Sequence, residues 1–238
     1  MLDVHSLHEP VRTWRGFLVH MATICLGILI AIVLEQSVEA MHRRQEAAVL
    51  RADLQAESRQ ILADATRTEI AHVYELGWLG TRAAQVQAAL WEHKALGPPL
   101  PNHMPDWASP DIPIWRAAKA TSRTSLLTKG EVNAYGEVEY VVAHLEISLE
   151  ARSKAEDAVR SFHRDFTLAN HERDFSKASA QDQRTYLGLL SNASVAFDRY
   201  LYWVRAVIGT EQAVIDGKTS LADIYASEEN RIGSSESM

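Results

Sequence analysis

The chain has few of the residues that interrupt helices or cross-link a fold. Its 238 residues include one cysteine, Cys25, which excludes an internal disulfide and any Cys-x-x-Cys motif. No proline lies between Val11 and Leu96, and only four of the eleven glycines do. Because proline and glycine are the residues that most often end helices, their scarcity permits very long helices in the first part of the chain.

Motifs of catalysis and nucleotide binding are also missing. The sequence has no His-Glu-x-x-His, no Gly-x-Ser-x-Gly, no Walker loop and no dinucleotide fingerprint, and its ten histidines are dispersed. A net charge of −7 without a dense Lys/Arg cluster argues against a nucleic-acid partner, because phosphate binding needs a basic face. We therefore predict a non-enzymatic protein with no catalytic residue, no cofactor, no metal and no nucleic acid as partner.

One long hydrophobic run is present, FLVHMATICLGILIAIVL, at residues 17–34. Its eighteen residues include no Asp, Glu, Lys, Arg or Pro. As a helix the run measures roughly 27 Å, close to the ~30 Å hydrocarbon core of a bilayer. We predict a transmembrane helix over 17–36. The alternative is a cleaved signal peptide ending at Ala40, whose apolar region is usually shorter, about 7–15 residues.

Basic residues flank the run almost equally on its two sides. Arg12 and Arg15 precede it, and Arg43, Arg44 and Arg51 follow it. Cytoplasmic segments usually carry the excess of Lys and Arg, so this near tie does not determine the orientation. We therefore expect the common signal-anchor arrangement, with a short tail inside and a long domain outside. The prediction is a single-pass protein of the cell inner membrane, with its soluble domain in the periplasm rather than the cytoplasm.

One face of the predicted span carries small and polar residues. Thr23, Gly27 and Ala31 are four residues apart, and His20 and Glu35 extend their row at its two ends. Small residues at this spacing let two helix backbones approach closely, so we predict helix packing within the membrane on this face. A lipid-facing helix with incidental small residues is the alternative.

Helical periodicity continues beyond the span. An apolar stripe recurs at spacings of three, four and seven, which predicts a helix with one buried face. The stripe consists of Leu50, Leu54, Ile61, Ala65 and Thr68. Two further glycines, Gly77 and Gly80, predict a bend before a segment that ends near Lys94. Residues 97–113 contain six of the seven prolines and are predicted to form a loop.

The second half of the chain predicts three more helices. A short one covers 112–123, with Trp115 and Ala118 on one side. Thr128 and Glu131 have the spacing of a capping box, so a long helix should begin there and end near 170–174. Ser179 is the predicted N-cap of a last helix that runs up to Gly217.

These elements predict an all-α fold, an N-terminal transmembrane helix that continues into an antiparallel helical bundle. The predicted divisions are a short tail at 1–16, the span at 17–36 and the bundle domain at 37–226. Residues 227–238, SEENRIGSSESM, are small and polar and are predicted to be disordered.

Two segments carry a family resemblance: GILIA at residues 27–31, and WRAAKAT at residues 115–121, the latter followed by a helix with tyrosines. The pattern resembles a broad group of uncharacterised bacterial single-pass membrane proteins with a GILIA-type anchor and a W-x-x-A-x-x-T segment. The resemblance implies a bacterial envelope location and the fold above, and it carries no activity. Ser122 stands where the pattern of the group has a glycine.

Two functional classes follow, and both are binding. The first is a structural or accessory protein-interaction module, with the 50–65 stripe and the Thr23 face as contact surfaces. Its partners are membrane lipid and either a second copy or another membrane protein. The second is a sensor-like bundle that binds a small molecule beside Trp115, Tyr135 or Tyr200 and signals through a separate partner, since sixteen residues before Phe17 leave no room for an output module.

The packing face in the membrane generates a first prediction. Gly27→Ile places a bulky side chain between two packed backbones, so it should weaken self-association modestly, by about 1 kcal/mol, without affecting insertion. Leu29→Ile, on a different face, is the control. A transmembrane-association reporter compares the two with the wild type, and equal signals from all three would show that this face contacts lipid.

Overall fold

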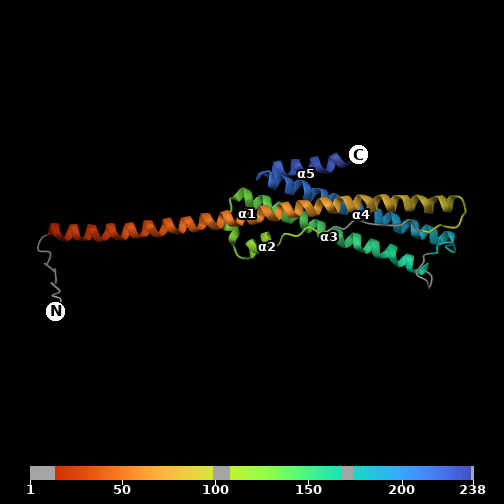
Figure 1. Ribbon diagram of the computed structural model, residues 1–238, viewed down its shortest axis with the longest axis horizontal. Coiled ribbons are helices and arrows are strands. Elements are labelled where there is room, and N and C mark those ends of the chain that lie inside the picture. Colours follow the sequence, from red (N-terminus) through yellow and green to blue (C-terminus); the bar gives the residue numbers. More distant parts are fainter. Residues whose placement is uncertain (1–13, 99–107, 168–173, 237–238) are drawn as a thin grey trace. The chain divides into compact units, whose positions relative to one another are not determined.

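The structure, a computed structural model, describes residues 14–98, 108–167 and 174–236 (Figure 1). Throughout these ranges the regular elements are helices, and no strand occurs among them, which confirms the all-α prediction. The chain divides into two compact units, Met1–Leu50 and Arg51–Met238, and each is described by itself. The first thirteen residues of the predicted tail lie outside the described residues.

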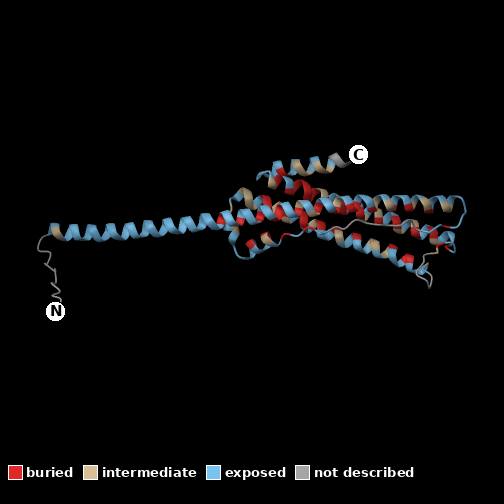
Figure 2. Ribbon diagram, viewed as in Figure 1, coloured by how far each residue is buried: buried red, intermediate tan, exposed pale blue. Residues whose placement is uncertain are grey.

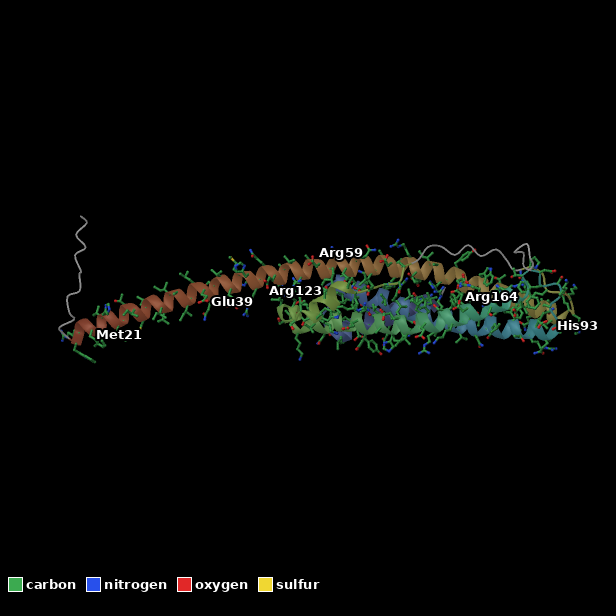
Figure 3. The ribbon with its side chains drawn as sticks, turned by 90° about the horizontal axis from the view of Figure 1, so that it is seen from below. Met21, Glu39, Arg59, His93, Arg123 and Arg164 are labelled. Carbon is green, nitrogen blue, oxygen red and sulfur yellow. The ribbon has the colours of Figure 1, made fainter. Side chains whose placement is uncertain are left out.

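The first unit contains the beginning of α1 (Trp14–Trp91), which includes the predicted span. Its apolar side chains are exposed along the whole run, with Leu26 at 59%, Leu29 at 58% and Leu34 at 61% (Figure 2). Side chains such as Met21 and Glu39 project from a single helix in Figure 3. By length and composition α1 is able to cross a membrane, the one helix among the described residues of which this is true.

In the second unit α1 continues without a break to Trp91, so the predicted bend at Gly77 and Gly80 is wrong. Both glycines have open space around them, and burial of the neighbouring Leu79 and Arg82 keeps the helix packed on the domain. The helix ends in a Schellman motif, in which the Lys94 amide donates to the Ala89 carbonyl at 2.9 Å.

Side chains of α1 hold the segment that follows it. The fully buried Arg82 donates to the carbonyls of Gly97 and Pro98, each at 3.0 Å. Thr68 donates its hydroxyl to the carbonyl of Ala108 at 2.8 Å. Both described ends of the predicted proline-rich loop are thus bound to α1, and residues 99–107 of this loop lie outside the described residues.

The short helix α2 (Pro113–Ala120) buries Trp115 and Ala118, as its sequence predicts. Its own first residues provide no side-chain cap. Instead the Glu57 carboxylate of α1 accepts from the amides of Ile114 at 2.5 Å and Trp115 at 3.1 Å. The 3₁₀ helix η1 (Arg123–Leu126) follows Ser122, whose φ of 57° is the left-handed conformation that favours glycine.

The two remaining long helices begin where their caps predict. In α3 (Lys129–Asp165) the Glu131 amide donates to the Thr128 hydroxyl at 3.2 Å, and in α4 (Ala180–Ile215) the Asp182 amide donates to the Ser179 hydroxyl at 3.1 Å. Both capping boxes are complete, so both predictions are confirmed. Such a cap stabilises a helix by roughly 1 kcal/mol.

The core of the second unit lies among α1, α3 and α4. Phe162 of α3 stacks on Tyr186 of α4, with ring centroids 4.7 Å apart, and Leu79 and Val86 of α1 belong to the same cluster. In Figure 3, Arg123 and Arg164 lie toward opposite ends of this unit, and His93 lies at the same end as Arg164.

The apolar stripe on α1 is part of this domain's own interior. Leu54 and Ala65 are fully buried, and Ile61 is 3% exposed. The stripe is therefore not a surface for a partner, which corrects that expectation. Each fully buried Leu or Ile contributes roughly 1.5–3 kcal/mol.

A helix replaces the predicted disorder at the end of the chain. Residues Leu221–Glu236 form α5, which packs on α4 with Ile224 fully buried. The prediction for 227–236 is wrong because contacts with distant parts of the chain, Gly209 of α4 and Glu69 of α1, order this polar segment. A Cβ built on Gly209 of α4 would be only 2.7 Å from the Cα of Glu228.

This close approach generates a prediction. Gly209→Ala should cost about 1–3 kcal/mol of stability, because the added methyl meets backbone atoms of α5 that cannot rotate away. Gly188→Ala, at an exposed position of the same helix with open space around it, should stabilise by roughly 0.5–1 kcal/mol. Urea unfolding of the full chain in detergent measures both, and equal effects would contradict the packing of α5.

Candidate functional site

The three residues predicted to line a ligand or partner surface are buried. Trp115 is 2% exposed, Tyr135 8% and Tyr200 0%. Trp115 stacks on Tyr135 with ring centroids 5.5 Å apart, and its indole N–H donates to Glu139 at 3.0 Å. These aromatic rings belong to the packed interior, where Trp115 joins α2 to α3, and they do not form a surface.

An open groove of about 450 Å³ lies instead on the side of the second unit where α5 meets α3 and α4. Three helices line it: Glu137 and Tyr140 from α3, Tyr202 and Trp203 from α4, and Tyr225, Glu228, Glu229 and Ile232 from α5. A surface with both carboxylates and aromatic rings is able to bind ligands by charge and by stacking. We take this groove as the candidate functional site.

Two tyrosine rings of the groove are set at steep angles to the Trp203 ring. The Trp203 ring lies 6.3 Å from that of Tyr140 at 75°, and 5.3 Å from that of Tyr202 at 89°. His144 supports the indole from α3, with ring centroids 4.5 Å apart. The rings therefore form neighbouring walls of different orientation, and Tyr140, Tyr202 and Tyr225 stay between 44% and 51% exposed.

The charge of the groove is negative. Glu137, Glu228 and Glu229 line it, and none of its lining residues is basic. Burial raises the pKa of Glu228 to about 7, and the negative charges of Glu137 and Glu229 add to the shift. The charge of Glu137 also raises the pKa of Tyr225, which donates its hydroxyl to Glu137 at 3.2 Å. A cation in the groove would relieve this repulsion.

An ion-pair clamp holds α5 in place beside the groove. Glu69 of α1 accepts from Arg205 of α4 at 3.0 Å and also pairs with Arg231 of α5. Because Glu69 and Arg205 are mostly buried, these pairs are screened less than surface pairs. Lys218 adds a hydrogen bond to Ser227 at 2.7 Å.

A separate buried polar cluster lies within the bundle. Glu211 of α4 is fully buried, and neither of its carboxylate oxygens accepts a hydrogen bond of normal geometry from the described residues. Burial raises the pKa of Glu211 to about 8, with a further contribution from the charge of Glu57, and the nearby Ser58 hydroxyl offsets only part of the shift. Glu57 has a structural task, the capping of α2.

The predicted packing residues of the membrane helix lie in the first unit. Thr23, Gly27 and Ala31 are exposed on α1, as are His20 and Glu35. The hydroxyl of Thr23 donates to the carbonyl of Val19 at 2.9 Å, a bond within the helix that leaves the small-residue face apolar. Helix packing at this face stays a prediction.

Sequence reasoning did not identify the groove residues. Tyr140 lies five positions after Tyr135 on α3, and Tyr202 two positions after Tyr200 on α4, so each lies on a different helical face from the predicted tyrosine. The sequence signal for these residues is that both tyrosines lie outside the apolar periodicity of their helices. That they share a groove with Tyr225 depends on the position of α5.

Comparison of the chain with protein-family models, curated proteins and solved structures finds no match. Among the residues described, no group of three or more His, Cys, Asp or Glu side chains has the geometry to hold a metal ion.

The buried Glu211 generates a pH prediction. Its pKa is about 8 in the folded chain against an ordinary value of 4.5, so across this interval the folded state holds a proton that the unfolded chain releases. The free energy of unfolding should therefore fall as the pH rises through this interval. Glu211→Gln should remove that part of the slope and stabilise the protein by roughly 2–4 kcal/mol at pH above 8, relative to its effect near pH 4.5.

The control is Asp198→Asn, an exposed position on the same helix. Urea unfolding at several pH values gives the slopes. A wild-type slope that persists in Glu211→Gln, or that is lost equally in Asp198→Asn, would show that Glu211 is not the responsible group.

Proposed function

We propose that the chain is a non-enzymatic, single-pass protein of the bacterial inner membrane whose helical domain is a structural or accessory protein-interaction module. The observation that carries this proposal is the exposed apolar stretch at the start of α1, which precedes in the sequence a domain with its own packed core. A water-soluble protein rarely leaves such a continuous apolar surface exposed. Membrane lipid is the solvent that suits it.

The domain is, in this proposal, an antiparallel bundle in which α4 runs against α1 and α3. The contacts between α3 and α4 support this order. His163 near the end of α3 meets Tyr186 near the start of α4 at 2.7 Å, whereas His144 earlier in α3 meets Trp203 later in α4. The two sets of residues thus pair in reverse order.

Contacts between α1 and α3 support a common direction for these two helices. Arg51 pairs with Glu131 near the start of α3, and Val86 shares a cluster with Phe162 near its end. Two consecutive long helices that run the same way need a connection as long as the domain. The described ends of that connection support this direction, because Gly97 is bound by Arg82 and Ala108 by Thr68, which lies earlier on α1.

The partners in this proposal are lipid and either a second copy or another membrane protein. The Thr23, Gly27 and Ala31 face supports contact within the bilayer, and the groove of α3, α4 and α5 supports contact outside it. The domain is assigned to the periplasm, the arrangement expected for a signal-anchor. The full chain has a net charge of −7, which makes nucleic acid an unsuitable partner.

The groove also supports a second candidate function, a sensor-like bundle that binds a small molecule and signals through a separate partner. Its volume of about 450 Å³ lies within the ~300–1,000 Å³ range of ligand sites. Its walls, however, are half exposed, while ligand sites cover most of the surface of their ligand. We therefore place this candidate second.

Membrane extraction tests the proposal. Carbonate washing should leave the chain in the membrane pellet, because the hydrophobic run at residues 17–34 is inserted. Mild detergent should then release it with a stoichiometric protein partner or a second copy. Release by carbonate, or a mature chain that begins at Met41, would contradict the anchor. A lone chain that carries a small molecule would favour the sensor instead.

A further inference from the structure

We infer that the groove formed by α3, α4 and α5 binds an arginine or lysine side chain presented by a partner protein. The inference rests on the proposed interaction function and names the chemistry of the partner. Three observations support it: the charge of the groove, the arrangement of its aromatic rings and the exposure of those rings.

The three carboxylates of the groove differ from most glutamates of α3 in having no ion-pair partner among the described residues. Glu131, Glu139, Glu146, Glu150 and Glu156 each form an ion pair within the chain. In the described part of the chain, no ion pair involves the three groove carboxylates at positions 137, 228 and 229. Three carboxylates gathered without a cation form a surface that is complementary to a basic group.

The aromatic rings add a second kind of attraction for a cation. Tyr140, Tyr202 and Trp203 present ring faces at steep angles, so a flat guanidinium is able to stack on one ring while its N–H groups point at carboxylates. The chain already uses this combination in its interior. Arg152 lies over the Phe197 ring at 4.5 Å and pairs with Glu156 at 3.3 Å.

The exposure of the rings favours a protein over a free small cation. Tyr140, Tyr202 and Tyr225 are about half exposed, so the groove covers one side of an occupant and leaves the other open. A side chain that remains attached to a larger body fits this shape. Tyrosine, tryptophan and arginine are also the residues that contribute most to protein interfaces.

Binding of a defined peptide tests the inference. The protein is the full chain in detergent micelles, and the probe is a seven-residue peptide with two arginines, uncharged ends and a net-neutral dye. Fluorescence anisotropy should detect binding that weakens about fivefold or more when citrulline, which has the same shape without the charge, replaces both arginines. Equal affinity for the citrulline peptide would overturn the inference.

Matched variants locate the site. Glu137→Gln and Tyr202→Ala should each weaken binding about three- to fivefold, by loss of a charge and of a ring face. Asp157→Asn on α3 and Val195→Ala on α4, both exposed and outside the groove, should leave it unchanged. Tyr225→Phe keeps the ring and should retain most of the binding. Circular dichroism melts verify that each variant is folded, and equal losses in groove and control variants would contradict the site.

Two further outcomes separate this inference from the proposed function. If methylguanidinium alone binds as tightly as the peptide, the occupant is a small cation, and the inference is wrong. If a partner protein co-purifies equally well with wild type and with the Glu137→Gln, Tyr202→Ala double variant, the interaction function stands and the groove is not its surface. If the partner co-purifies with the wild type but not with the double variant, both the interaction function and the groove as its surface are supported.

Discussion

The close approach of α5 to α4 at Gly209 is the constraint on which the candidate site depends. A side chain at this position would meet the backbone of Glu228 and push α5 outward. With glycine there, Tyr225, Glu228 and Glu229 come to lie opposite Tyr202 and Trp203. The groove is thus a product of backbone contact, and the ion pairs of Glu69 with Arg205 and Arg231 retain α5 once it is in place.

Helix α1 organises the rest of the domain through polar side chains on its buried face. Glu57 caps α2, Thr68 and Arg82 bind carbonyls on either side of residues 99–107, and Glu69 binds α4 and α5. Burial of polar groups is costly unless hydrogen bonds replace those with water, so each of these contacts selects one arrangement of a neighbour. Glu211 is the exception, since its carboxyl group is buried without an equivalent partner and favours the protonated form.

Local signals were sufficient for part of the fold. The capping boxes at Thr128 and Ser179 predict the starts of α3 and α4 because a cap involves only residues three positions apart. Gly77 and Gly80 predict a bend that does not interrupt α1, because tertiary packing overrides the weak helix propensity of glycine. The helix α5 and the groove could not be predicted from the sequence. Residues 227–236 are polar, which locally indicates disorder, but they form a helix because of contacts with Gly209 and Glu69, which are far away in the sequence.

Hydrogen exchange of α5 in the full-length protein tests the central claim most directly, namely that this helix is docked and forms one wall of the groove. The amides of residues 225–233 lie within α5, and the burial of Ile224 and the Arg231 ion pair anchor them. The account predicts exchange at least about a hundredfold slower than for an unstructured peptide, since docking should be stable by a few kcal/mol. Exchange at the rate of an unstructured peptide would contradict the docked helix and remove the groove with it.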